Sequence, residues 1–401
     1  MKSNMKNTAQ CYGLTLFAVA LLFAASYGAG QCAAMAYVSA YDSEWMPFQT
    51  MPPLALYRGD AQRTGVFAED GIREMHGIRW QQRFGEAAHA GPVFAAGVIY
   101  LPNGDGRIRA IDTATGEVLW AYRAKPESSV FSSVALADGV VYAGIEGNRL
   151  YALDAHTGDV LWKVKTKGIV WTAPLVVGDS LYFASQNGFF YAVSISMQAQ
   201  QWKLKIKRES LWPAVYDNGT IFFAAESVLY ALDAATGGEK WRLERPAAQW
   251  WGPPAFADGM LYAGSGDGRF YAIDAATGTA IWSAPANSDV WSAPAIADQM
   301  VYVGNRDTFV RAFDAKTGEL IWHVQLEDWA VTDPVIAGNV IYVAVGNHEG
   351  QEGPRHLYAL DRQTGAELWT FQADSRILSA PGVGDGAIYV QAFSGTLYAV
   401  E

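Results

Sequence analysis

Residues 272–282 read Ala-Ile-Asp-Ala-Ala-Thr-Gly-Thr-Ala-Ile-Trp, and this stretch decides the fold because the chain repeats it. The pattern Ala-x-Asp-x-x-Thr-Gly-x-x-x-Trp is intact in six places, and a tryptophan returns every 39 to 47 residues. A period near forty residues with short β-rich runs is typical of a β-propeller. The intact copies are 110–120, 152–162, 231–241, 272–282, 312–322 and 359–369; the recurring tryptophans are Trp80, Trp120, Trp162, Trp202, Trp241, Trp282, Trp322 and Trp369.

Three more short strands accompany each tryptophan strand. One unit has apolar runs at 292–297, 300–304 and 310–314 before the tryptophan strand 319–324, with turn residues between them. Short strands at such spacing favour antiparallel four-stranded sheets. The second strand repeats an aromatic residue eight times, so the sequence predicts an all-β, eight-bladed propeller with four antiparallel strands in each blade. These aromatic residues are Tyr100, Tyr142, Tyr182, Phe222, Tyr262, Tyr302, Tyr342 and Tyr389.

Each residue type in the repeated turn has a mechanical reason. The aspartate can accept hydrogen bonds from the backbone that follows, the glycine supplies a positive φ, and the alanine leaves room for the indole. The indole is expected to fill the wedge between neighbouring blades. One unit, 192–202, carries Ser194, Met197 and Gln198 where the others have Asp, Thr and Gly. We expect that blade to form with a different turn.

The two ends of the repeat region complement each other. Residues 77–84 form a lone fourth strand around Trp80, whereas the chain stops at Glu401, just after a third strand. Pairing this N-terminal strand with the C-terminal blade would complete the eighth blade and remove two exposed edges. The sequence therefore predicts a ring closed by its own termini.

The first 36 residues have the pattern of a signal peptide. Lys2 and Lys6 precede the apolar run 14–25, and residues 34–36 read Ala-Met-Ala. An uncleaved membrane anchor is the alternative, and Cys32 leaves a lipid anchor open although Gln31 stands where a small residue is wanted. Residues 37–53 are then an extended linker and 54–401 the propeller. We expect a periplasmic or envelope-associated protein, because such a segment directs export.

The chain carries 40 acidic and 29 basic residues, a formal net charge of -11. An acidic surface repels phosphates, which argues against nucleic acid as a partner. Membrane contact is expected only through the N-terminal segment, and the protein is expected to be a monomer. Cleavage after Ala36 would remove both cysteines and with them any disulfide.

The repeated turn with its tryptophan resembles the pyrroloquinoline quinone (PQQ)-type propeller repeat, as does the lead-in Tyr-Arg-Gly-Asp-Ala-Gln-Arg-Thr-Gly at 57–65. The resemblance covers residues 54–401. It implies one of two groups: quinoprotein dehydrogenases, or non-enzymatic propellers such as the scaffold subunit of the outer-membrane β-barrel assembly machinery. Eight blades in about 400 residues with an export signal look like the second group. That reading implies envelope proteins as partners, no cofactor and no catalysis.

The dehydrogenase alternative would imply PQQ with calcium. The resemblance places that cofactor beside adjacent cysteines and under a calcium clamp, and this chain has no Cys-Cys pair. The Gly-Asp-Gly segments at 104–106, 266–268 and 384–386 lack the spaced oxygen ligands of a calcium loop and fit tight turns. A PQQ-dependent dehydrogenase or a propeller that binds a small ligand remains the alternative to a non-catalytic scaffold.

A second pattern marks the entry to the innermost strands. Four consecutive units place a tryptophan three residues before the proline of that strand or its equivalent, and further aromatic and polar residues lie beside it. The rings either fill space near the axis or form an aromatic arc at one mouth of the channel, suited to a flat ligand or a peptide. The residues proposed for binding are Trp171, Trp212, Gln249, Trp250, Trp251, Asp289, Trp291, Trp329 and Arg376.

Two further candidates lie in the seventh unit. Asp333 stands before the proline in Thr-Asp-Pro, near the predicted axis, where an unpaired charge would be costly. Arg376 of the next unit is the expected partner of Asp333. The loop 346–356 is the longest between two strands of a unit, and its His348 and Glu349 are proposed as partner contacts. A tolerated surface insertion is the alternative for that loop.

Overall fold

The computed structural model describes residues 54–85, 90–123, 130, 132–145, 147–206, 212–245, 252–330, 332–346 and 355–401. The chain divides into two units, residues 1–49 and 50–401, and every described residue belongs to the second. The predicted signal peptide and almost all of the predicted linker fall in the first unit. Both lie outside the described residues.

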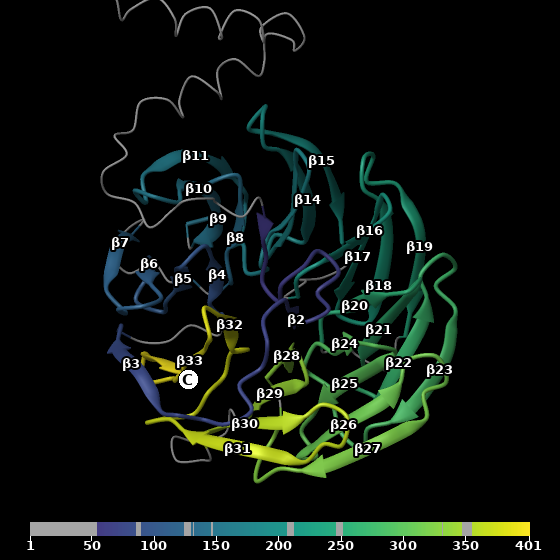
Figure 1. The fold of residues 1–401 in the computed structure, drawn as a ribbon. Coiled ribbons are helices and arrows are strands. Elements are labelled where there is room, and N and C mark those ends of the chain that lie inside the picture. Colours follow the sequence, from purple (N-terminus) through teal and green to yellow (C-terminus); the bar gives the residue numbers. More distant parts are fainter. Residues whose placement is uncertain are drawn as a thin grey trace, which may run out of the picture. The chain divides into compact units, whose positions relative to one another are not determined.

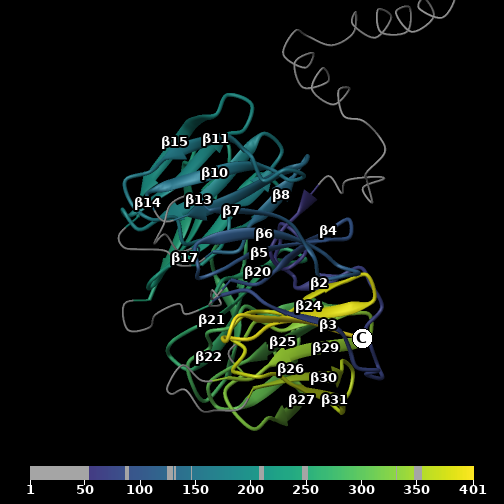
Figure 2. The same ribbon diagram turned by 90° about the vertical axis from the view of Figure 1, so that its left-hand side faces the viewer.

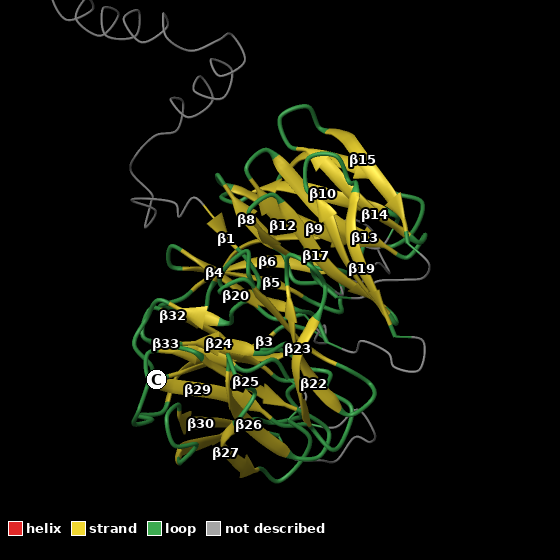
Figure 3. Cartoon of the chain, turned by 90° about the vertical axis from the view of Figure 1, so that its right-hand side faces the viewer, coloured by secondary structure: helices red, strands yellow, loops and turns green. Residues whose placement is uncertain are grey.

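The described residues form eight sheets, and each contains a blade of four antiparallel strands that runs from the centre of the unit to its rim (Figure 1). Two of the sheets also carry a fifth, two-residue strand from the segment that precedes the blades. Figure 3 shows strands and loops throughout the described part of the chain. Blade 1 consists of β4 (Val93–Ala95), β5 (Val98–Pro102), β6 (Arg107–Asp112) and β7 (Val118–Arg123). Blade 2 consists of β8 (Ala135–Ala137), β9 (Val140–Ile145), β10 (Arg149–Asp154) and β11 (Val160–Lys165). Blade 3 consists of β12 (Leu175–Val177), β13 (Ser180–Ser185), β14 (Phe189–Ser194) and β15 (Ala199–Lys205). Blade 4 consists of β16 (Val215–Asp217), β17 (Thr220–Ala225), β18 (Val228–Asp233) and β19 (Glu239–Glu244). Blade 5 consists of β20 (Ala255–Ala257), β21 (Met260–Gly264), β22 (Arg269–Asp274) and β23 (Ala280–Pro285). Blade 6 consists of β24 (Ala295–Ala297), β25 (Met300–Gly304), β26 (Phe309–Asp314) and β27 (Leu320–Gln325). Blade 7 is β28 (Val335–Ala337), β29 (Val340–Ala344), β30 (His356–Asp361), β31 (Glu367–Gln372), and blade 8 is β32 (Gly382–Gly384), β33 (Ala387–Gln391), β34 (Thr396–Val400), β3 (Ile78–Arg83).

The core lies between neighbouring blades, whose apolar side chains pack against each other. Figure 2 shows the blades after a 90° turn from Figure 1. The second and third strands are buried along nearly their whole length, whereas the outer strands alternate between exposed and half-buried residues. The repeated second-strand aromatic is buried in every blade and contacts the tryptophan of its own blade, as in Tyr142 and Trp162 with ring centroids 5.8 Å apart. The eight-bladed, four-stranded antiparallel propeller predicted from the repeat is confirmed.

The repeated turn links each blade to the blade before it. Asp274 accepts hydrogen bonds from the backbone N–H and the hydroxyl of Thr277, which holds the turn in shape. Gly278 has a φ of 73°, and a Cβ there would lie 2.7 Å from the indole of Trp241 in the preceding blade. That indole donates a 2.8 Å hydrogen bond to the carbonyl of Ala275. The glycine is therefore needed for close approach to the tryptophan as well as for its φ.

Blade 3 forms with a different turn, as predicted. Ser194 occupies the aspartate position and Gln198 takes the glycine position with a φ of 53°. Asp179, from the turn between the first two strands, accepts hydrogen bonds from the hydroxyls of Ser194 and Ser196 and from the backbone N–H of Ser196 at 2.7–2.8 Å. Asp179 thus replaces the missing turn aspartate from across the hairpin.

Replacing Asp179 with asparagine should lower the free energy of unfolding by about 1 kcal/mol at pH 7, because charge-assisted hydrogen bonds are weakened. Burial raises the pKa of Asp179, but the bonds from Ser194 and Ser196 outweigh it and hold the pKa below its ordinary value. The carboxylate therefore stabilises the fold above its unfolded-state pKa, and this contribution falls as the pH drops through the folded-state pKa. Urea denaturation at pH 7 and pH 3.5 measures both effects. Asp217→Asn, in the matching hairpin of blade 4, is the control and should change little; an equal loss in both variants would contradict the assignment.

The ring closes where β3 pairs antiparallel with β34, with Trp80 opposite Ala399. Residues 54–77, which precede β3, form what we call the axial strap. Its strand β1 (Leu54–Ala55) pairs with β8 of blade 2, and β2 (Val66–Phe67) pairs in parallel with β28 of blade 7. Between them, strap carbonyls accept hydrogen bonds from the inner strands of blades 4, 5, 6 and 7 in turn. The strap runs through the centre of the blades in Figure 1.

The strap also replaces a turn that blade 8 lacks. In blades 1, 2 and 4–7 the turn between the third and fourth strands supplies the carbonyl that accepts the indole hydrogen bond of the preceding blade. Blade 8 has no such turn, because its third and fourth strands come from opposite ends of the chain. The carbonyl of Ile72 accepts the indole N–H of Trp369 at 2.8 Å instead. The strap therefore completes the last junction between blades.

Candidate partner-binding site

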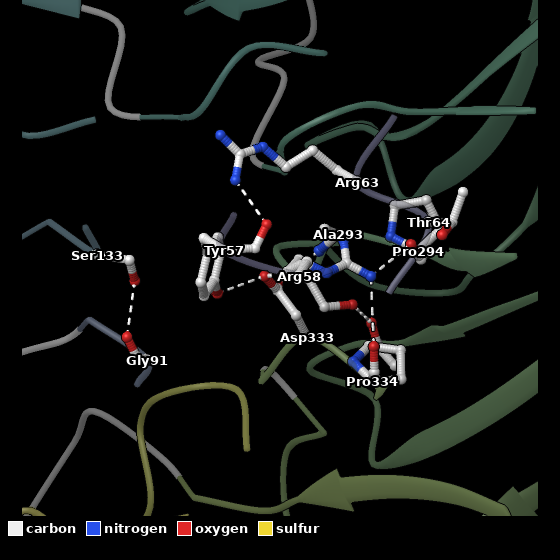
Figure 4. Close-up of polar contacts among 12 residues, drawn as sticks. Tyr57, Arg58, Arg63, Thr64, Gly91, Ser133, Ala293, Pro294, Asp333 and Pro334 are labelled. Carbon is white, nitrogen blue, oxygen red and sulfur yellow. Dashed lines mark hydrogen bonds and ion pairs between the residues drawn. The ribbon is translucent and has the colours of Figure 1, made fainter. Parts of the chain in front are cut away.

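Charged strap residues are buried at the axis (Figure 4). The guanidinium of Arg63, fully buried, donates to the carbonyls of Tyr57, Ala214 and Pro174. These partners belong to the strap and to the entries of blades 4 and 3, so one side chain joins three segments. Burial lowers the pKa of Arg63 to about 10, and the group remains a cation at neutral pH.

Arg58 and Asp333 form a second group at the axis. One guanidinium nitrogen of Arg58 donates to the carbonyl of Pro294 at 2.7 Å, and its Nε lies 3.9 Å from the Asp333 carboxylate. Asp333 also accepts the hydroxyl of Tyr57 at 2.8 Å and the backbone N–H of Ala293 at 2.7 Å. Burial first, and then the charge of Asp333, raises the pKa of Tyr57 well above its ordinary value, so the phenol stays protonated.

The expected pairing of Asp333 with Arg376 is wrong. The strap brings Tyr57 and Arg58 to Asp333, which satisfies the carboxylate without a residue of the next blade. The guanidinium of Arg376 instead lies 4.1 Å from the ring centroid of Phe393 in blade 8. Arg58, and not Arg376, is the cation beside Asp333, because the strap that carries Arg58 occupies the axis.

The described members of the proposed aromatic arc are half-buried where the chain enters blades 3, 4, 6 and 7. They are Trp171, Trp212, Trp291 and Trp329. Trp212 packs against the apolar core between blades 4 and 5, which agrees with the space-filling interpretation for this ring. Gln249, Trp250, Trp251, His348 and Glu349 lie outside the described residues.

At blades 6 and 7 the structure brings three of the predicted residues together through an arginine that the sequence analysis missed. The guanidinium carbon of Arg306 lies 3.9 Å from the ring centroid of Trp329 and 5.0 Å from that of Trp291. Asp289 lies 3.9 Å from Arg306, an ion pair with both side chains partly exposed. A signal was available: Arg306 stands in a turn where blades 1 and 5 carry Gly104 and Gly266.

The cation–π contacts, the loose ion pair of Arg306 and the hydrogen bonds of the axial cluster are features of binding and packing. Within the described ranges, no group of three or more His, Cys, Asp or Glu side chains is placed to hold a metal ion. No helix among the described residues has the length and hydropathy to cross a membrane.

Solved structures similar to this chain share its propeller fold. BamB from Moraxella catarrhalis matches at 20% identity and a TM-score of 0.69, covering 82% of this chain and 99% of its own. The quinohemoprotein alcohol dehydrogenase from Comamonas testosteroni matches at 16% identity and a TM-score of 0.74, covering 93% of this chain and 84% of its own. The computationally designed protein Ika8 matches at 18% identity and a TM-score of 0.69, over 79% of this chain and 97% of its own.

No curated protein matches the sequence significantly. A family model described as "Outer membrane protein assembly factor BamB" matches residues 73–144, 127–215, 224–329 and 306–401. These segments span all eight blades, including the closing strand β3. The chain therefore belongs to the BamB family of propellers.

Proposed function

We propose that this protein is an exported, non-catalytic propeller that binds protein partners in envelope assembly, with β-barrel assembly components as the expected partners. The observation that carries the proposal is the family match over residues 73–215 and 224–401, joined to the arginine and tryptophan residues at the strand-entry side of blades 6 and 7. Arginine and tryptophan are the residue types enriched where binding energy concentrates. The rigid blades would hold these loops in place while a partner docks.

The axial cluster supports a binding role over a catalytic one. One guanidinium nitrogen of Arg58 and all three of Arg63 donate to backbone carbonyls of the strap and of several blades, and Asp333 is held by Tyr57, Arg58 and Ala293. Such groups fix the ring. The strand-entry loops are then the surface through which the protein would act.

Affinity capture of the tagged, exported protein from its native envelope tests the proposal. Replacing Trp291 or Trp251 with alanine should reduce recovery of β-barrel assembly components by about tenfold, the cost of losing an aromatic side chain that anchors a partner. Leu161→Gln, on the exposed rim of blade 2, is the control and should bind normally. Unchanged recovery with both tryptophan variants would remove the arc from the proposal, and no recovery with the unaltered protein would contradict the function.

A quinone-dependent dehydrogenase is the second candidate, because solved dehydrogenases share the fold over most of this chain. It would need calcium ligands, and no three or more His, Cys, Asp or Glu side chains of the described residues lie together so as to hold a metal ion. Adding PQQ with calcium and following dye reduction separates the two candidates. Cofactor-dependent reduction would favour the enzyme.

A further inference from the structure

We infer that the outer edges of blades 2 and 3 bind an extended, acidic segment of a protein partner, which adds to them as a β-strand. Four exposed lysines lie on these edges, Lys163 and Lys165 on β11 and Lys203 and Lys205 on β15. We call these four residues the lysine rim. The inference goes beyond the proposed function, because it concerns a different surface from the strand-entry loops. Three observations lead to it: the concentration of lysines, the absence of a neutralising carboxylate among the described residues, and the direction of the backbone.

The lysines of this acidic protein are concentrated on two neighbouring blades. Five of the seven lysines within the described ranges lie between positions 163 and 205, and only Lys240 and Lys316 lie elsewhere. Blades 2 and 3 alone carry lysine both one and three residues after the outer-strand tryptophan. The same positions are Ser283 and Pro285 in blade 5, and His323 and Gln325 in blade 6. The repeat itself therefore does not require lysine at these positions.

The positive charge of the lysine rim is not compensated within the described part of the chain. Every ion pair between described residues has an arginine or a histidine as its cation, so no carboxylate pairs with these lysines. Arg149 stands directly opposite Lys165 in the register of β10 and β11, and like charges at such positions destabilise a sheet. Lysine on an edge strand can serve only to prevent association. The edge strands of blades 5 and 6 contain neither lysine nor arginine, so this propeller does not depend on that protection.

The backbone groups of the same four lysines point away from their own blades. The N–H of Thr166 donates to the carbonyl of Asn148 at 2.8 Å, and the N–H of Ile206 donates to the carbonyl of Gly188 at 2.9 Å. Because this direction alternates along a strand, the N–H and C=O groups of the lysine rim face outward. β11 and β15 are the outermost strands of their sheets (Figure 1). An added strand would therefore meet hydrogen-bonding groups and positive side chains at the same residues.

A segment with an acidic residue at every second position fits this edge. Side chains on one face of an extended strand recur about every 6.8 Å, which is also the spacing of the two lysines on each outer strand. Main-chain hydrogen bonds would supply affinity, and pairs of opposite charge across the strands would select the sequence. The Nζ of Lys203 lies 5.0 Å from the ring centroid of Phe189 on β14, a cation–π contact that holds it on this face of the blade.

A labelled short peptide that alternates glutamate with threonine tests the site on the full protein. The peptide should bind, whereas its glutamine counterpart should not. The same peptide with methylated backbone nitrogens should bind about tenfold more weakly, because it cannot donate hydrogen bonds to the edge. Hydrogen exchange at the backbone N–H groups of the lysine rim should slow when the unmodified peptide binds. Equal binding of the methylated or the glutamine peptide would overturn the proposal. Binding to vesicles of anionic phospholipid without binding of the peptide would also overturn it, by making the rim a lipid-headgroup surface.

Two matched pairs of substitutions locate the peptide. Lys203→Gln with Lys205→Gln should weaken its binding by about tenfold, because two cross-strand pairs of opposite charge are lost. Lys240→Gln with Lys316→Gln removes the same charge from other blades and should bind the peptide like the unaltered protein. An equal loss in both variants would reveal an effect of net charge and overturn the site. Capture of β-barrel assembly components is scored separately: capture without peptide binding would leave the proposed function standing without this site, and peptide binding without capture would leave the site standing without that function.

Discussion

Replacing Arg63 with methionine is expected to lower the free energy of unfolding by at least about 3 kcal/mol. The guanidinium is fully buried and donates to three carbonyls from the strap and from blades 3 and 4. Methionine fills much of the volume but leaves those acceptors without donors, and each unsatisfied buried group costs about 1–3 kcal/mol. Denaturation in urea, followed by tryptophan fluorescence, measures the loss.

Arg73→Met is the matched control for this variant. Arg73 also belongs to the strap, but its side chain is 53% exposed and pairs with Asp361 at the surface. An exposed ion pair contributes about 0–1 kcal/mol, so this variant should unfold almost like the unaltered protein. If both variants lowered the free energy of unfolding by the same amount, the buried hydrogen bonds of Arg63 would not stabilise the fold as proposed.

Deleting residues 37–76 should have a still larger effect, leaving a protein without cooperative unfolding. The deletion removes β1, β2, Arg58 and Arg63, together with the Ile72 carbonyl that accepts the indole of Trp369. It exposes inner-strand backbone groups in four blades that the strap now satisfies. Thermal unfolding and the yield of soluble protein report the outcome.

Deleting only residues 37–51 is the control for the longer deletion. It leaves the axial strap and the closing strand β3 in place, so its thermal unfolding should match that of the unaltered protein. Normal unfolding of the longer deletion would show that the ring closes without its strap. A severe defect in the shorter one would show that residues before the strap contribute to the fold.

The fold could be predicted from sequence because its determinants are local and repeated. An indole, a turn aspartate and a turn glycine recur in a fixed order, and blades 1, 2 and 4–7 use the aspartate in the same way. The irregular turn of blade 3 was also visible as a departure from the repeat. Its repair by Asp179 was not, since that residue lies on the neighbouring turn of the hairpin.

The contacts at the axis of the propeller could not be predicted, because they join residues far apart in the chain and do not repeat from blade to blade. Tyr57 and Asp333 are 276 positions apart, and Arg63 and Pro174 are 111 apart. The pairing of Asp333 with Arg376 failed since it considered only the neighbouring blade. Arg306 was missed because the comparison of units followed the tryptophans and not the turn between them. Asp289, Trp291 and Trp329 were identified as candidates, and their common neighbour was not.

The axial strap has a consequence for biogenesis. It is translated before any blade, yet its partners extend to blade 8, where the Glu69 carboxylate accepts the backbone N–H groups of Asp385 and Gly386. The final junction joins Arg79 to Glu401, 322 positions away. Loop closure over such spans is slow, so early segments must wait while the remainder of the polypeptide emerges. While the chain is still attached to the ribosome or the translocon and lacks its last blade, its axial strap would therefore be undocked and its ring would be open. Release of the final residues, rather than synthesis of any single repeat, should set the moment at which this protein becomes resistant to proteases.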